Sequence, residues 1–169
     1  MKRILTTVAI LLTVAVSSLS GQIKNAGCYL RMVEPENEEL SLENDLVRID
    51  FTFSSYNYFC DVTFRNKTDQ ILTIDWDKSI VIIEEESDRI IFDDTRMIDK
   101  GRLGTATLAP GTKITKAIAS AQHIELEMEY YTKGWVKKRG TQYIGFIFPV
   151  TTEDGQTTNC QCKISVSLQ

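Results

Sequence analysis

LVRIDFTF, residues 46–53, fixes the fold class of this chain because apolar and polar residues alternate along it. Apolar residues at every second position all project to one side of an extended backbone. A strand with one buried face has this period of two, whereas an amphipathic helix repeats about every 3.6 residues. The stretch therefore predicts a half-buried β-strand.

The same alternation returns along most of the chain, at residues 58–64, 72–76, 124–130, 144–150 and 160–168. Residues 80–83 form instead a continuous β-branched run, which is typical of a strand covered on both faces. Turn-forming residues separate these segments at 66–69, 108–112 and 153–155. Since no segment carries a convincing helical stripe, we predict an all-β fold, an antiparallel β-sandwich of immunoglobulin-like architecture in one domain.

The ends of the chain differ from this pattern. Residues 1–20 begin with Met1-Lys2-Arg3, continue as an apolar run and end in small residues, which is typical of a secretory signal peptide. Residues 21–45 are polar and carry an acidic cluster, so we expect a solvated lead-in arm. The predicted sandwich then occupies residues 46–169.

Charge and location restrict the partners. The whole chain has 19 Lys and Arg against 23 Asp and Glu, and the predicted signal peptide removes Lys2 and Arg3. A mature net charge of about −6 argues against nucleic acid as a ligand. The apolar run of the predicted signal peptide is too short for a comfortable membrane span, and no second apolar segment follows it, so we expect no transmembrane segment in the mature chain. We expect a periplasmic or secreted protein whose partner is an envelope protein or a glycan.

Four cysteines would remain after export: Cys28, Cys60, Cys160 and Cys162. An even number in an exported chain predicts disulfides, and strand alternation points Cys60, Cys160 and Cys162 into the core. Cys160 and Cys162 would be about 7 Å apart along one strand, too extended a pair to bridge. We expect Cys60 to pair with one of them and Cys28 with the other. Structural zinc and free buried thiols are the alternatives.

Catalytic motifs are not found in the sequence, and neither catalytic residues nor a cofactor are predicted. His123 is the single histidine, and the sequence contains no nucleophile motif for which it could act as a catalytic base. Four carboxylates are weak candidates for a cation site if loops bring them together: Asp75, Asp77, Asp93 and Asp94. The simpler interpretation is a solvated acidic surface, so we predict no metal.

One stretch combines aromatic and basic residues, a pattern that stacks on sugars or peptides. It supplies the candidate binding residues Tyr130, Tyr131, Trp135, Lys137, Lys138 and Arg139. A basic hairpin tip is the alternative interpretation.

Residues 64–77, FRNKTDQILTIDWD, resemble a signature of small bacterial exported proteins and lipoproteins, in which a strand is followed by Asn-Lys-Thr and an Ile-Asp-Trp strand. Residues 97–100 and 108–114 follow in the order of that family's later blocks. The resemblance implies a β-sandwich in the cell envelope and no particular activity. Many such proteins carry a lipid on a cysteine, which here would be Cys28, although Asn25 departs from the lipid-attachment pattern.

These observations predict an exported, non-catalytic binding or assembly module. One alternative is a hydrolase that acts on glycan or peptide through carboxylates brought together by the fold. Another is a structural subunit that donates residues 21–43 as a strand to a neighbour.

Overall fold

Residues 47–53 form strand β4 (Val47–Phe53) as predicted, with Val47, Ile49, Phe51 and Phe53 buried on one face. The structure is a computed structural model that describes residues 23–25, 27–53, 59–94, 101–122 and 132–168. Its other elements are β1 (Ile23–Asn25), β2 (Cys28–Glu34), β3 (Ser41–Glu43), β5 (Cys60–Asn66), β6 (Leu72–Asp75), β7 (Ile80–Ile83), β8 (Glu86–Phe92), β9 (Thr105–Leu108), β10 (Lys113–Ser120), α2 (Lys133–Arg139), β11 (Gln142–Thr152) and β12 (Thr157–Ser167).

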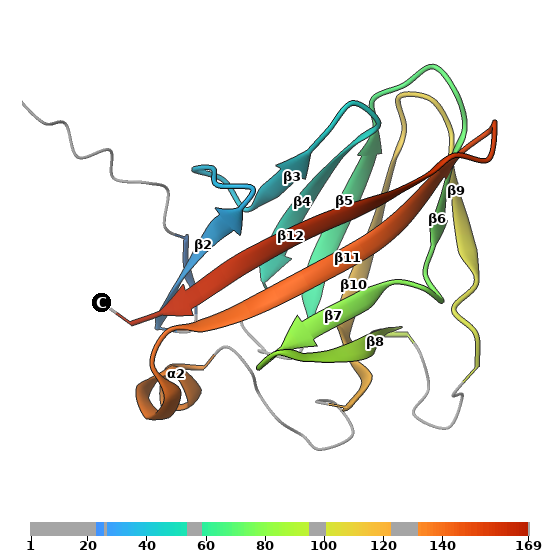
Figure 1. Cartoon of the computed structure of the whole chain (residues 1–169). Helices are drawn as coiled ribbons and strands as arrows, with labels where there is room; N and C mark the ends of the chain where they lie inside the picture. The colour runs from blue at the N-terminus through green and yellow to red at the C-terminus, as the bar shows by residue number, and fades with distance from the viewer. Residues whose placement is uncertain (1–22, 26, 54–58, 95–100, 123–131, 169) are drawn as a thin grey trace, which may run out of the picture.

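All strand pairings among the described residues are antiparallel, which confirms the predicted all-β class. The strands form one path in the order β1-β2-β12-β11-β7-β8-β10-β5-β4-β3; off this path, β6 pairs with β11, and β9 pairs with β6. Strand β8 pairs with β7 and β10 and so joins the two layers into one sheet. Because β12 also contacts β3, the sheet nearly closes on itself (Figure 1).

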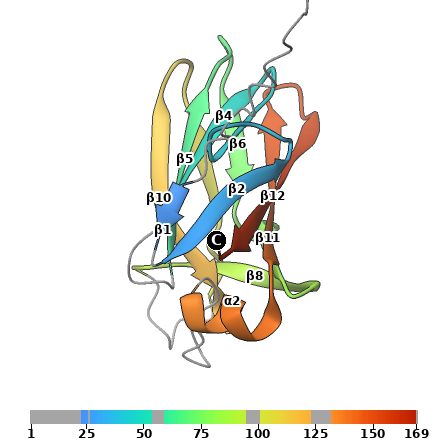
Figure 2. The ribbon, with the colours of Figure 1, turned by 90° about the vertical axis from the view of Figure 1, so that its left-hand side faces the viewer.

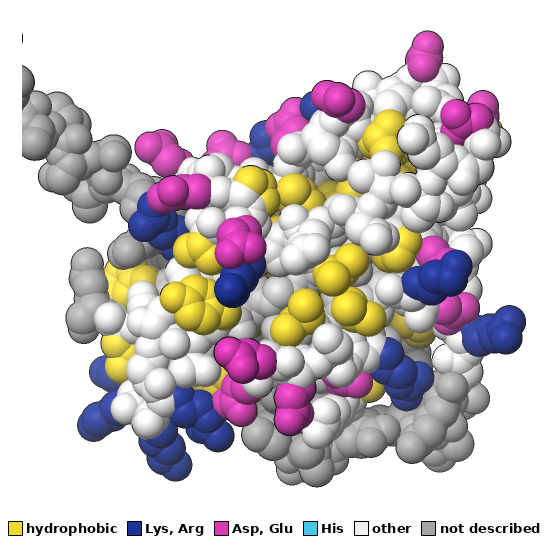
Figure 3. Space-filling view, in the orientation of Figure 1, with side chains coloured by type: hydrophobic (Ala, Val, Ile, Leu, Met, Phe, Trp, Pro, Cys, Tyr) yellow, Lys and Arg dark blue, Asp and Glu magenta, His cyan; other side chains and the backbone are white. Residues whose placement is uncertain are grey.

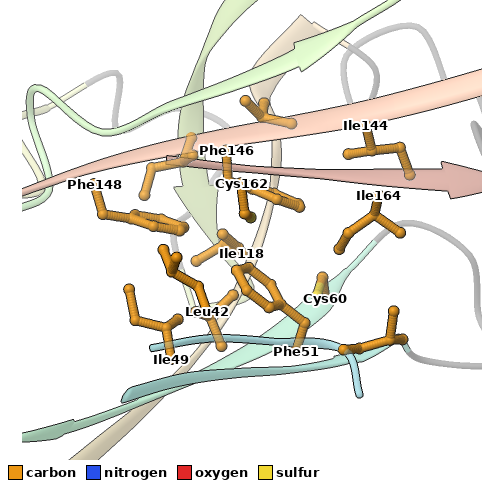
Figure 4. Close-up of a cluster of buried hydrophobic side chains, with 14 of the residues drawn as sticks. Leu42, Ile49, Phe51, Cys60, Ile118, Ile144, Phe146, Phe148, Cys162 and Ile164 are labelled. Atoms are coloured by element: carbon orange, nitrogen blue, oxygen red, sulfur yellow. The ribbon is translucent and has the colours of Figure 1, made fainter. Parts of the chain in front are cut away.

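The core lies between the two layers (Figure 2). Phe51 of β4 stacks on Phe146 of β11, with ring centroids 5.3 Å apart. Phe64 of β5 meets Phe148 of β11 edge to face at 5.1 Å. Figure 4 shows Phe51 of one layer facing Phe146 and Phe148 of the other, among aliphatic side chains. Such aromatic pairs contribute about 0.5–1.5 kcal/mol each beyond the area that they bury.

Residues 23–25 and 27–45 do not form the separate arm that the sequence predicts for residues 21–45. Strand β2 pairs with β12 between Tyr29 and Glu34, and Leu30 and Met32 are completely buried. The apolar residues of β2 alternate like those of β4, and the acidic cluster that follows them obscured this pattern. Strands β1, β2 and β3 therefore belong to the domain, and β2 completes the sheet of its own chain.

The cysteines are buried as free thiols, so the predicted disulfide pattern is wrong for this structure. Cys60, Cys160 and Cys162 do point into the core, as strand alternation predicts. Cys28 is also completely buried, at the start of β2. Each thiol is packed among apolar side chains like a small hydrophobic residue, and Cys160 Sγ accepts a hydrogen bond from Asn44 Nδ2 at 3.4 Å.

Helix α2 was not predicted, because a seven-residue helix with only Trp135 and Val136 buried has no repeating apolar stripe. Local capping explains it: Thr132 accepts a hydrogen bond from the Trp135 N–H, and Gly140 ends the helix at a φ of 77°. No helix within the described ranges is long and apolar enough to cross a membrane.

Candidate functional site

Trp135, the aromatic residue of the predicted patch that the structure describes, is not available to stack on a ligand. Trp135 is only 6% exposed, and its Nε1 donates to Glu84 Oε1 at 2.9 Å. Arg139 Nε lies 2.6 Å from the same oxygen. These two residues therefore fix α2 to the β7–β8 turn, while Lys137 and Lys138 are exposed. Tyr130, Tyr131 and His123 lie outside the described residues.

The two carboxylates after β6 stabilise turns. Asp75 accepts from the Lys78 N–H at 3.2 Å and pairs with Lys78 Nζ at 2.8 Å. The hydrogen bond from the Lys78 side chain lowers the pKa of the Asp75 carboxyl. Asp77 Oδ1 accepts from the Leu103 and Gly104 N–H groups at 2.7 and 3.2 Å. Both side chains thus have structural partners.

The other acidic pair follows β8, where Asp93 and Asp94 are exposed. Asp94 lies 3.7 Å from Lys116 Nζ. Within the part of the chain that the structure describes, no three His, Cys, Asp or Glu side chains gather where they could hold a metal ion. Asp75, Asp77 and Asp94 are thus engaged locally, and the structure does not bring the four predicted carboxylates together as a metal site.

A surface hollow of about 210 Å³ lies instead on the outer face of β2, β12, β11 and β7. It is lined by Glu34, Ile82, Glu85, Tyr143, Gly145, Gln161, Cys162 and Lys163. Gly145 pairs with Ile82 across β11 and β7, and with Lys163 across β11 and β12. A Cβ added at Gly145 would lie 3.2 Å from Ile82 Cβ, so the missing side chain helps to keep the hollow open.

The face around the hollow is apolar. Tyr143 is 47% exposed and stands two residues from Gly145 on the same side of β11. Ile80 and Ile82 of β7 and Ile147 of β11 are half-buried and share this outer face. Figure 3 shows hydrophobic side chains gathered over β11 and β7, with acidic side chains along the lower edge. Hereafter we call Ile80, Ile82, Tyr143, Gly145 and Ile147 the outer apolar face.

Charged residues line one end of the hollow. Lys163 Nζ lies 4.8 Å from the centroid of the Tyr143 ring and 3.9 Å from Glu34 Oε1. A cation over an aromatic ring is attracted by the negative face of the ring. Glu85 also lines the hollow, and no ion pair or hydrogen bond joins it to another described residue.

Glu85 belongs to an unusual turn. Glu84 and Glu85 connect β7 to β8 with φ values of 53° and 68°. Tight hairpin turns with two such residues favour Asn and Gly, because other side chains are strained at positive φ. The contacts of Glu84 with Trp135 and Arg139 offset that cost for Glu84. Glu85 has no comparable contact among the described residues.

The sequence contained part of the signal for this site. The run at residues 80–83 predicts a strand covered on both faces, yet only Val81 and Ile83 reach the core. Residues 143–149 likewise have apolar side chains on both sides of β11. What sequence reasoning missed is the register that places Gly145 beside Ile82, because this pairing joins residues 63 positions apart.

Comparison with known proteins adds little to this description. No protein-family description matches the chain, and a comparison with curated proteins gives no match. One solved structure, of a protein from Archaeoglobus fulgidus, is similar over 76% of this chain and 98% of its own, with 11% identity and a TM-score of 0.39.

Proposed function

We propose that this protein is an exported, non-catalytic module that binds a protein partner of the cell envelope through the outer apolar face. The observation that supports this proposal most directly concerns strand β7. Its sequence is typical of a strand that is covered on both faces, yet Ile80 and Ile82 remain partly exposed to solvent. Exposed contiguous apolar surface marks interaction sites in soluble proteins. Tyr143 adds a large aromatic side chain, the type enriched where partners bind.

A protein partner fits this face better than a glycan. The part of the outer apolar face that lies beyond the hollow, Ile80 and Ile147, is aliphatic and offers no hydrogen bonds to sugar hydroxyls. The hydrolase alternative has less support, because three of the four carboxylates considered for a cation site, Asp75, Asp77 and Asp94, are engaged in turns or ion pairs. The hollow itself brings Glu34 and Glu85 beside a tyrosine and a lysine, without a histidine.

Export is the second part of the proposal and rests on the signal-peptide pattern of residues 1–20. We favour a protein without a lipid anchor. Cys28 is completely buried in β2, and cleavage immediately before it would remove β1. The resemblance to exported proteins and lipoproteins supports the location and leaves the partner open.

Site-specific photocrosslinking tests the binding face. A photoreactive phenylalanine analogue at position 143 is exposed to an envelope extract of the organism that encodes the protein. The same analogue at Ile71 is the matched control, because Ile71 is also exposed, at 42% against 47% for Tyr143, and precedes β6. We expect a discrete protein adduct from position 143 that is lost when Ile147→Ser or Ile82→Ser is added.

Equal labelling from both positions would contradict a specific face. Adducts that survive the serine substitutions would also contradict it, because they would not depend on apolar contact. Circular dichroism of each variant checks that the sheet is intact. We expect it to be intact, because these positions contribute little to the buried core.

A further inference from the structure

We propose that the hollow at Gly145 receives a lysine or arginine side chain of the protein partner, with its cationic end facing Glu85. This inference rests on the proposed function and adds the chemistry of the bound group. Shape, charge and backbone geometry each support it.

The shape suits one long side chain. A hollow of about 210 Å³ is smaller than the ~300–1,000 Å³ of pockets that enclose drug-sized ligands. Gly145 gives it a floor without a side chain, and Ile82 and Tyr143 provide apolar and aromatic surface. Lysine and arginine have apolar stems that lie along such surface while their charged ends stay at the rim.

The side chains that line the hollow carry one more negative charge than positive charge. It is lined by the acids Glu34 and Glu85 and by one base, Lys163. Lys163 lies 3.9 Å from Glu34 and over the Tyr143 ring, so its charge is already engaged. Glu85 is left without a charged partner among the described residues. A cation supplied by the partner would complete the set, whereas an anion would meet Glu85 unfavourably.

The backbone indicates why a glutamate is held at this position. Left-handed backbone geometry is strained for a residue other than glycine, because its Cβ lies too close to the following carbonyl oxygen. Glu84 regains stability through Trp135 and Arg139, but Glu85, at a φ of 68°, does not. Strain that no contact in the free protein offsets is typical of ligand-binding positions. We infer that Glu85 is used for its carboxylate and not for the turn.

The experiment uses defined probes and not the natural partner. The ¹⁵N-labelled protein is titrated with N-acetyl-lysine methylamide, with the uncharged norleucine analogue and with the glutamate analogue. We expect the lysine probe to shift the amide signals of Gly145, Gln161 and Lys163 in a saturable way. The norleucine probe should bind at least about threefold more weakly, the scale of a partly exposed ion pair, and the glutamate probe more weakly still.

Two variants locate the interaction. Glu85→Gln should reduce lysine-probe affinity to that of norleucine, and Gly145→Ala should weaken both probes by narrowing the hollow. Glu86→Gln is the matched control, because Glu86 is an exposed neighbour that does not line the hollow. Equal binding of all probes, or an unchanged lysine affinity in Glu85→Gln, would overturn the inference.

The outcome separates this inference from the proposed function. If position 143 crosslinks a partner but the lysine probe does not bind, the face is a binding surface and the cation inference is wrong. If the probe binds in the Glu85-dependent way but position 143 gives no adduct, the hollow recognises cations and the proposed protein-binding role fails.

Discussion

Asn66 stabilises the turn that contains the Asn-Lys-Thr sequence of residues 66–68. Its side chain is 2% exposed and Nδ2 donates to the Gln70 and Leu108 carbonyls at 2.8 and 2.9 Å. Oδ1 accepts from the N–H and hydroxyl of Thr68, both at 2.8 Å. One buried amide therefore ties the end of β5 to the end of β9. The signature residue has a structural role, which agrees with its place in a turn.

We predict that Asn66→Ala destabilises the fold by about 2–3 kcal/mol, because buried carbonyl groups lose their donors. Thr68→Ala should cost about 1 kcal/mol, since it removes only the hydroxyl bonds and leaves the Thr68 N–H bonded to Asn66. Urea unfolding followed by circular dichroism measures both. Equal losses for the two variants would contradict the central role of the Asn66 amide.

The core thiols predict a pH dependence. Burial raises the pKa of Cys60 and of Cys162 above the ordinary thiol value of 9.0. The folded protein accommodates only the neutral thiols. Their contribution to the free energy of unfolding is therefore complete below the unfolded-state pKa, and it is lost as the pH rises from there towards the folded-state pKa. The free energy of unfolding should therefore fall above about pH 9, by up to ~1.4 kcal/mol per pH unit for each thiol.

Urea unfolding at pH 8, 9 and 10 checks this slope, with Cys162→Ala as the comparison. The variant starts from lower stability because it leaves a cavity, but its stability should decline less steeply with pH. Parallel declines in the two proteins would assign the effect to other groups.

At the scale of elements, the β7–β8 turn connects the fold to the proposed site. We predict that Glu85→Gly raises the free energy of unfolding by about 0.5–1 kcal/mol, because glycine accepts a φ of 68° without strain. Glu84→Gly should fail to stabilise, because it removes the acceptor of Trp135 and Arg139. Thermal unfolding of the two variants provides the measurement, and destabilisation by Glu85→Gly would show that its side chain has an unrecognised structural role.

Elements also show what the sequence could predict. Strands such as β4 and β12 were predictable because one face is buried and alternation is a local property. The face of β7 was harder, because Ile80–Ile83 has apolar residues on both sides and local sequence cannot show which side stays uncovered. The hollow depends on the register between β7 and β11, which is a non-local property.

At the scale of the whole molecule, residues 21–45 decide whether the sheet is complete. We predict that a chain beginning at Leu46 fails to fold, because it lacks β2 and exposes the partner edge of β12. Leu30 and Met32 are completely buried, and removing such side chains costs about 2–5 kcal/mol each. A chain beginning at Gly21 should give a cooperative unfolding transition and a sharp gel-filtration peak. A folded, stable short chain would restore the separate arm and the strand-donation alternative.

The native N-terminus allows export and fold to be tested together. We expect mass spectrometry of the protein from its own cells to find Gly21 or Gln22 as the first residue, because small residues precede both positions. Either product retains β1 and β2 whole. Cleavage before Cys28 would delete β1 and place a lipid on a sulfur that the fold buries completely. A diacylglyceryl mass on Cys28 would therefore contradict the predicted N-terminus without a lipid anchor. It would also require the first residue of β2 to leave the core.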